Sequence, residues 1–408
     1  MYHPKDMVDL IADNVKKTGN PFGVTNKSIN DWWRDASLKQ NGTNGEYMLF
    51  TGMMYQMVPY IEEMTVQLEK WEDTGKQSLI KYAKYLPKFL MGLYLRTRTD
   101  SKIKKEYDNI LLNIVKVLRR SDVDFYYNPE LDYYSGILLY DMGDDEAFKD
   151  HAKLVARKLK ENGVKKIVTV DPHTTYALKV LYPKYTGEEF EVKTYFELLD
   201  IDITQSKLYL EGEKSSENSR VTIHDPCFYG RYLELSDKPR RVLTDLGLTC
   251  DDIRRSQTFT DCCGGPAESL SPKLSNEVRS RRIEELSKSD SPLVTMCPIC
   301  LANLRKSVEV EDLSNKIVNL LTEGPPLHMI EPLLLYWQIE KEGGEVSKER
   351  LREIGREYGQ SGVLGSHFVG KEPFLVKKGV DKRALTPKAE KLVESYQDWL
   401  EKQEKSGQ

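Results

Sequence analysis

The chain has 408 residues, of which 30% are charged and 39% are hydrophobic, and its formal net charge is -4 at pH 7. This composition is typical of a folded protein of about two domains and excludes a largely disordered chain. The near balance of charge gives no electrostatic footprint for nucleic acid. The sequence shows no apolar run of about 18 residues and no secretory signal, so we expect a cytoplasmic protein without a transmembrane segment.

The first half of the chain alternates between helical and strand patterns. Apolar residues recur every three or four positions in the helical segments, and the strands are short apolar runs. The predicted elements are a helix at 7–16, a short helix opening at 30–33, a strand at 47–52, helices within 60–119, a strand at 125–127, a helix at 146–162 and a strand at 166–170.

The second half repeats this order of elements. The predicted elements are a strand at 221–224, a helix at 240–247, a strand at 258–260, a helix at 274–287 and a strand at 293–296. Strands that alternate with helices at this spacing predict an α/β fold with parallel strands.

An internal repeat relates the two halves. The matched positions are 168–174 with 294–300, Ser135-Gly136 with Cys263-Gly264, and Gly52-Met53 with Pro226-Cys227. We therefore predict two pseudo-symmetric α/β units, the first with a helical insertion. The expected regions are an N-terminal helical segment at 1–45, a first unit at 46–205, a second unit at 206–337 and a charged C-terminal tail at 338–408.

Five of the six cysteines form one pattern in the second unit. Cys227 is followed after 34 residues by Cys262-Cys263, and after 33 more by Cys297-Pro298-Ile299-Cys300. Thiolates are soft ligands that suit zinc, copper(I) and iron–sulfur centres. Each group of cysteines is expected at the C-terminal end of a strand, where the loops of a parallel sheet converge. Cys250 lies outside the pattern, and we interpret it as incidental.

The residues alone leave several interpretations open. Buried structural thiols are a weak explanation for five cysteines on three turns. Four thiolates would satisfy tetrahedral zinc, although one cysteine would be left over. A thioredoxin-like CxxC would not explain the adjacent pair of cysteines. We favour a metal cluster.

Segments 224–232, 262–265 and 297–300 resemble the cysteine-rich CCG domain of the B-type and D-type subunits of heterodisulfide reductases. That domain also occurs in the iron–sulfur subunits of glycolate, lactate and anaerobic glycerol-3-phosphate oxidising enzymes. The resemblance covers about residues 15–335, including the first unit.

The resemblance implies an oxidoreductase subunit that reduces a disulfide or oxidises thiols, passing electrons one at a time. In the family, the five-cysteine motif holds a [4Fe-4S] cluster that is non-cubane in form, and zinc is the alternative metal. The implied metal ligands and catalytic residues are Cys227, Cys262, Cys263, Cys297 and Cys300. His224 would join the catalytic residues by bonding a cluster sulfur or relaying a proton, while packing or capping would explain it equally well.

The first unit departs from the family pattern. Its residues at the ligand positions are Met53, Tyr134, Ser135, Asp171 and Thr174, so we expect no cluster there. The sequence also lacks a ferredoxin-type cysteine run. Electrons would therefore pass to or from a ferredoxin-like iron–sulfur subunit or a flavoprotein, and any peripheral membrane association would come through such partners.

Two other functions remain open at this point. One is the iron–sulfur subunit of a flavin-linked 2-hydroxyacid or glycerol-3-phosphate oxidase, and the other is a structural subunit stapled by zinc.

Arg231 would hold an acidic substrate group or form a surface salt bridge. Asp171, His173 and His151 would form a weak metal site, although helix capping by Asp171 explains that turn as well.

Overall fold

The computed structural model describes residues 4–36, 38, 45–74, 97–201, 206 and 220–321. The predicted tail at 338–408 and the helical positions at 75–96 lie outside them. The chain divides into two compact units, and the larger, Met1–Ile201 with Ser215–Asn319, contains both sheets. In the smaller unit, Asp202–Lys214 with Leu320–Gln408, Ser206 and Leu321 form an antiparallel bridge.

Two four-stranded parallel sheets organise the larger unit, in the orders β2-β1-β3-β4 and β6-β5-β7-β8. Each sheet therefore places its first and third strands at the centre and its second and fourth at the edges. The strands are β1 (Tyr47–Phe50), β2 (Phe125–Tyr126), β3 (Lys166–Thr169), β4 (Glu191–Thr194), β5 (Arg220–Ile223), β6 (Thr249–Asp251), β7 (Leu293–Thr295) and β8 (Val310–Asp312). The predicted α/β class and the pseudo-symmetric repeat are confirmed. We call the parts built on these two sheets the first copy and the second copy.

Helices and helical turns connect the strands. Up to β4 they are α1 (Pro4–Thr18), α2 (Asn26–Ile29), η1 (Trp32–Ala36), α3 (Met54–Thr74), α6 (Ser101–Arg120), α7 (Ile137–Asp141), α8 (Asp145–Glu161), α9 (Pro172–Tyr176), η3 (Ala177–Leu181) and α10 (Tyr182–Thr186), with η4 (Tyr195–Glu197) after it. From β5 onward they are η7 (Phe228–Tyr232), α12 (Asp237–Asp245), η8 (Gln257–Phe259), η9 (Gly265–Ser269), α13 (Pro272–Leu286), α14 (Pro298–Leu304) and α15 (Leu313–Leu320). None of the described helices is long and apolar enough to cross a membrane.

Local sequence explains where the long helices begin and what they bury. The side chain of Asp100 caps α6 by accepting a hydrogen bond from the backbone N–H of Lys102 at 2.7 Å. Ile110 and Ile114, at helical spacing, are fully buried on its inner face. Gly163, which follows α8 with a φ of +72°, takes the left-handed conformation that ends a helix.

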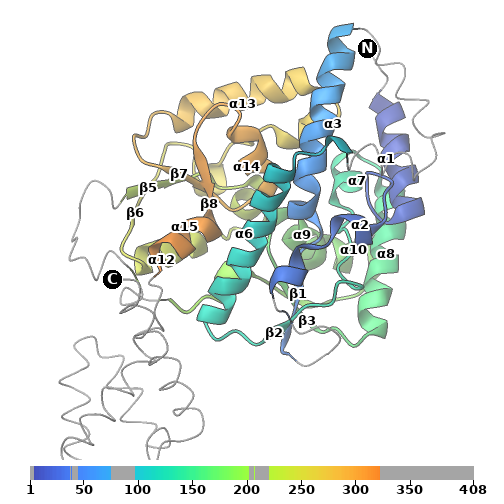
Figure 1. Ribbon diagram of the computed structural model, residues 1–408, viewed down its shortest axis with the longest axis horizontal. Helices are drawn as coiled ribbons and strands as arrows, with labels where there is room; N and C mark the ends of the chain where they lie inside the picture. The colour runs from blue at the N-terminus through green and yellow to red at the C-terminus, as the bar shows by residue number, and fades with distance from the viewer. Residues whose placement is uncertain are drawn as a thin grey trace, which may run out of the picture. The chain divides into compact units, whose positions relative to one another are not determined.

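The helical insertion of the first copy packs against the second copy. Helices α3 and α6 lie side by side (Figure 1). From α3, the hydroxyl of Tyr55 donates to Asp312 Oδ2 at 2.8 Å, and from α6, Glu106 pairs with Arg305 at 3.0 Å. A buried hydrogen bond and a charged pair thus join the two copies into one body that contains the cysteine turns.

The predicted strand at 258–260 is wrong. Residues 257–259 form the 3₁₀ turn η8 and Thr260 follows as its C-cap, and Gln257 has a φ of +55°, which no regular strand adopts. The backbone N–H of Gln257 donates to Asp225 Oδ2 at 2.7 Å, and Thr260 Oγ1 donates to the Asp225 carbonyl at 2.7 Å. These side-chain bonds take the place of sheet pairing. The real edge strand is β6, which contains Cys250.

Candidate metal centre

Three turns of the second copy bring the five cysteines of the motif together. Cys227 lies just beyond β5, and Cys297 follows β7 as the N-cap of α14. The adjacent pair follows η8, not a strand as predicted, and leads into η9. Side-chain hydrogen bonds connect the sulfurs in the order Cys227, Cys262, Cys263, Cys300 and Cys297. The structure therefore places all five predicted ligands in one continuous group, and Cys250 lies outside it on β6.

Backbone N–H groups point at three of these sulfurs. Gly264 donates to Cys262 Sγ at 3.3 Å, and Gly265 donates to Cys263 Sγ at 3.4 Å. The N–H of Cys300 donates to Cys297 Sγ at 3.5 Å. Donors placed on sulfur stabilise the thiolate, which is the form that ligates metals.

Two glycines allow the chain to turn so tightly. Gly264 has a φ of +88°, and a Cβ on it would lie 2.7 Å from the carbonyl oxygen of Ser275. A Cβ on Gly265 would overlap the side chain of Ile299. The left-handed backbone at Gly264 and the close approaches at both positions therefore require the two glycines of this turn.

The five cysteines differ in pKa because of their contacts with one another. Hydrogen bonds from Cys227 and Cys263 lower the pKa of Cys262, and the same contact raises the pKa of Cys227. Burial alone would raise the pKa of Cys297, but contact with Cys300 and with His173 lowers it to about 6. Five thiolates in contact would repel one another strongly. A cationic soft-metal centre relieves that repulsion, so the donor set fits thiolate ligation of an iron–sulfur or zinc centre.

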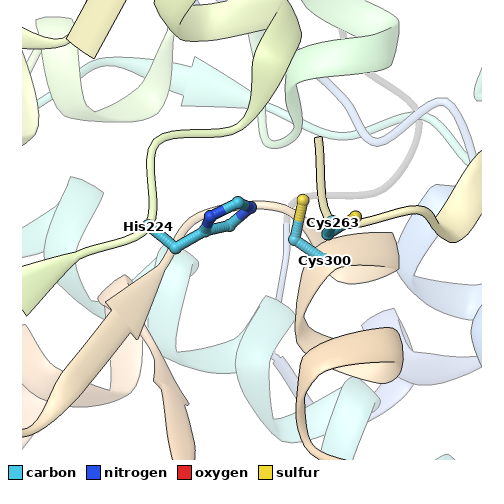
Figure 2. A group of neighbouring side chains, drawn as sticks. All are labelled: His224, Cys263 and Cys300. Atoms are coloured by element: carbon cyan, nitrogen blue, oxygen red, sulfur yellow. The ribbon is translucent and has the colours of Figure 1, made fainter. Parts of the chain in front are cut away.

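His224 faces the centre from the end of β5. Figure 2 shows its imidazole directed at the sulfur side of Cys263 and Cys300, and the nearest ligand atoms of all three lie within 4.8 Å of one another. Its Nδ1 accepts a hydrogen bond from Arg282 Nε at 3.1 Å. Burial and the charge of Arg282 lower the pKa of His224 to about 3, so the ring is neutral. The ring proton must then sit on Nε2, which has no partner among the described residues.

His173 of the first copy reaches across to the same cysteines. Its Nδ1 lies 3.8 Å from Cys297 Sγ and 3.5 Å from Asp171 Oδ1. Burial would lower the pKa of His173, but Cys297 and Asp171 raise it well above its ordinary value. The sequence placed His173 in the cysteine-free copy and did not predict this contact with the second copy. It also gave no sign of Arg282, a charged residue that is buried beside His224.

Other residues singled out in the sequence have structural contacts. Asp171 caps α9, accepting from the N–H groups of His173 and Thr174 at 2.9 and 3.1 Å, which supports the capping interpretation. His151 contacts the carbonyl oxygen of Tyr134 through Nε2 at 2.7 Å. Arg231 is exposed and lies over the ring of Tyr232.

The fold and the site together define an α/β domain whose cysteine-bearing turns converge on one soft-metal donor set. Residues 221–305 match the family model of the CCG cysteine-rich domain. The chain therefore carries a CCG domain, as its sequence predicted.

The chain is similar to several oxidoreductases. It is 26% identical over 315 residues to the probable iron-sulfur-binding oxidoreductase FadF of Bacillus subtilis, covering 73% of this chain and 38% of the relative. It is 31% identical over 221 residues to the D-type subunit of the dihydromethanophenazine:CoB–CoM heterodisulfide reductase of Methanosarcina mazei, covering 51% and 53%. It is 28% identical over 212 residues to the EtfAB:quinone oxidoreductase of Syntrophomonas wolfei, covering 49% and 29%.

The chain spans at most about half the length of these relatives. Their names place them among oxidoreductases or subunits of oxidoreductases, and one of them is named as iron–sulfur-binding. The chain is thus similar to parts of oxidoreductases, one of them named as iron–sulfur-binding.

Proposed function

We propose that this chain is the electron-transferring iron–sulfur subunit of a heterodisulfide-reductase-like complex. In this proposal, it carries out disulfide and thiol redox chemistry at a [4Fe-4S] centre of non-cubane form. The observation that carries the proposal is the continuous group of five sulfurs, one more than a tetrahedral zinc site uses. The proposed ligands are Cys227, Cys262, Cys263, Cys297 and Cys300.

Burial divides the proposed ligands into an inner and an outer set. Cys263, Cys297 and Cys300 are at most 3% exposed, whereas Cys227 and Cys262 are partly exposed. The inner sulfurs are therefore shielded from water more completely than the outer two. The cluster, when bound, supplies one-electron transfer to or from substrate sulfur.

Two imidazoles lie close to the sulfurs. His224 presents its Nε2–H toward the group, and Arg282 fixes that tautomer by occupying Nδ1. His173 lies against Cys297 and is stabilised in its charged form by Asp171. These residues are proposed to stabilise negative charge on sulfur and to keep a proton near a leaving thiolate.

A single centre needs partners for a two-electron reaction. The first copy has no cysteine in its sequence, so each electron must arrive from or depart to another polypeptide. A ferredoxin-like iron–sulfur subunit or a flavoprotein would serve this role, since both classes exchange single electrons.

The proposal is tested by EPR of the anaerobically purified, oxidised protein before and after addition of a thiol. We expect a signal that changes when the thiol binds, in the wild type and equally in Cys250→Ser. A signal that ignores thiols and disulfides would contradict disulfide chemistry and would favour a simple electron relay to a flavin-linked oxidase.

A further inference from the structure

A cavity of about 500 Å³ lies beside the cysteine turns. Its walls come from α1, α3 and α7, and from η9 and Ile299 of the second copy. Its volume is within the range typical of small-molecule sites. The cavity is therefore large enough for a ligand rather than a few waters.

One end of the cavity adjoins the proposed metal centre. His173 lines it and lies 3.8 Å from Cys297 Sγ. Gly265 also lines it, and its N–H donates to Cys263 Sγ. A molecule that fills the cavity therefore touches residues that contact the sulfurs.

The rest of the lining is apolar and adaptable. It includes four methionines, one from α1 and three from α3, together with Trp71 on α3; the methionines are Met7, Met54, Met57 and Met64. Unbranched thioether side chains adjust their shape to the ligand, and methionine-rich surfaces accept varied apolar molecules.

The charges in the lining select against anions. None of the described residues that line the cavity is a lysine or an arginine, and Nδ1 of His173 already lies 3.5 Å from Asp171 Oδ1 and 3.8 Å from Cys297 Sγ. The two carboxylates of the lining belong to Asp141 and Glu268, and Glu268 forms an ion pair with Lys306. Burial also raises the pKa of Asp141 to about 6, as expected for a carboxyl group in apolar surroundings. A phosphate, sulfonate or carboxylate on a ligand would find no unbalanced cation among these lining residues.

We propose that this cavity binds a neutral, largely apolar small molecule and directs its disulfide or thiol sulfur toward the cysteine centre. The identity of the reactive group rests on the proposed function, whereas the neutral, apolar body rests on the lining alone. The inner end, with His173 and Gly265, would hold the sulfur, and the methionine-lined end would hold the apolar part.

Equilibrium dialysis of the full-length protein against two disulfides tests this inference. The neutral probe is di-n-butyl disulfide, and the anionic probe is the disulfide of 2-mercaptoethanesulfonate. We expect the neutral probe to bind at least tenfold more tightly. Equal affinity for the two probes, or no binding of the neutral probe because another part of the chain fills the cavity, would overturn the inference.

A matched pair of variants on α3 locates the binding site. Met64→Lys places a charge in the lining at a half-buried position, and we expect it to weaken binding of the neutral probe at least tenfold. Val66→Lys adds the same charge at a position that is 42% exposed and outside the lining, and binding should not change. Met64→Trp reduces the free volume without adding charge and should also weaken binding. Equal effects of both lysine variants would place the probe elsewhere.

Equilibrium dialysis reports on binding in the cavity, and EPR reports on the redox chemistry, so the two proposals can fail independently. A protein that selects the neutral disulfide but shows no thiol-dependent EPR change would contradict the proposed function and leave the selectivity of the cavity in place. A protein with the EPR change but without this selectivity would contradict the cavity inference alone.

Discussion

The two copies share a backbone design but differ in the atoms that fill it. Gly136 and Gly264 hold matched turns at φ values of +86° and +88°. At the next turn, Asp171 Oδ1 accepts the backbone N–H groups that open α9, just as Cys297 Sγ accepts the N–H of Cys300 in α14. Oxygen in one copy thus occupies the capping position that sulfur occupies in the other.

This difference shows that the turns do not depend on metal ligands. In the first copy, Ser135 Oγ, Asp171 Oδ2 and Thr174 Oγ1 stand at ligand positions, buried and without partners among the described residues. The first copy is held instead by a carboxylate network: Asp132 accepts from the N–H and hydroxyl of Thr51 at 2.8 and 2.6 Å. Turns of this shape therefore form without cysteine.

Removing one cysteine is expected to have the largest effect. Cys297→Ser should lose all of the metal, because serine oxygen is a poor ligand for soft metals. The fold should survive, since an oxygen caps the matched turn of the first copy. Iron analysis and circular dichroism check both outcomes, with Cys250→Ser as the control that keeps its metal. A Cys250→Ser protein without metal would contradict the ligand assignment.

Exchanging the matched glycines for alanine compares how tightly the two turns are packed. Gly264→Ala should lower the free energy of unfolding by about 2–4 kcal/mol. The positive φ and the approach of the new Cβ to the Ser275 carbonyl oxygen both contribute. At Gly136 the nearest atom is a ring carbon of His151 at 3.0 Å, which can shift, so we expect about 1–2 kcal/mol.

Urea denaturation gives both values for the glycine pair. Gly143 has a φ of +79°, and a Cβ added there would meet nothing within 4 Å, so Gly143→Ala measures the backbone cost alone. Equal losses at Gly264 and Gly136 would contradict the tighter packing of the cysteine turn.

Replacing His224 by the residue that the first copy has at this position separates two roles. Phe50 is the counterpart of His224 at the end of β1. His224→Phe should retain its iron but shift the EPR spectrum, because an apolar ring replaces the polar imidazole beside Cys263 and Cys300. It should also lose about 1–3 kcal/mol of stability, since Arg282 Nε loses its acceptor. Loss of iron would instead identify His224 as a ligand.

The buried carboxylate of the first copy predicts a modest pH dependence. Burial raises the pKa of Asp132 to about 6, so the folded state holds its proton more tightly than the unfolded state does. Stability from this group is present at low pH and is lost as pH rises through 6. Relative to Asp132→Asn, the wild type should lose about 1 kcal/mol between pH 5 and pH 7. Urea denaturation at both pH values measures this difference, and a pH-independent difference would refute the shifted pKa.

The sequence revealed the central strands and the cysteine motif because their signals are local. Strands β1, β3, β5 and β7 are short apolar runs, and the cysteine spacing is visible by inspection. The edge strands β4, β6 and β8 were missed or misplaced because an edge strand needs few apolar residues. Strand β6, for example, contains Asp251, which forms an ion pair with Arg220 of β5 at 2.5 Å.

Contacts between distant segments could not be predicted. His173 meets Cys297 across 124 residues, and Arg282 meets His224 across 58. Each contact depends on how the two sheets and their helices pack, and no spacing rule encodes it. The repeat did indicate that position 173 lies in the turn matched to the CxxC, and this was the sequence signal that connected His173 with the site.

The metal content of anaerobically purified full-length protein tests the central claim most directly. Iron, zinc and acid-labile sulfide should be measured together. The five-cysteine cluster predicts about four irons per chain together with acid-labile sulfide. One zinc per chain without sulfide would contradict it and would make the second copy a zinc-stapled structural domain.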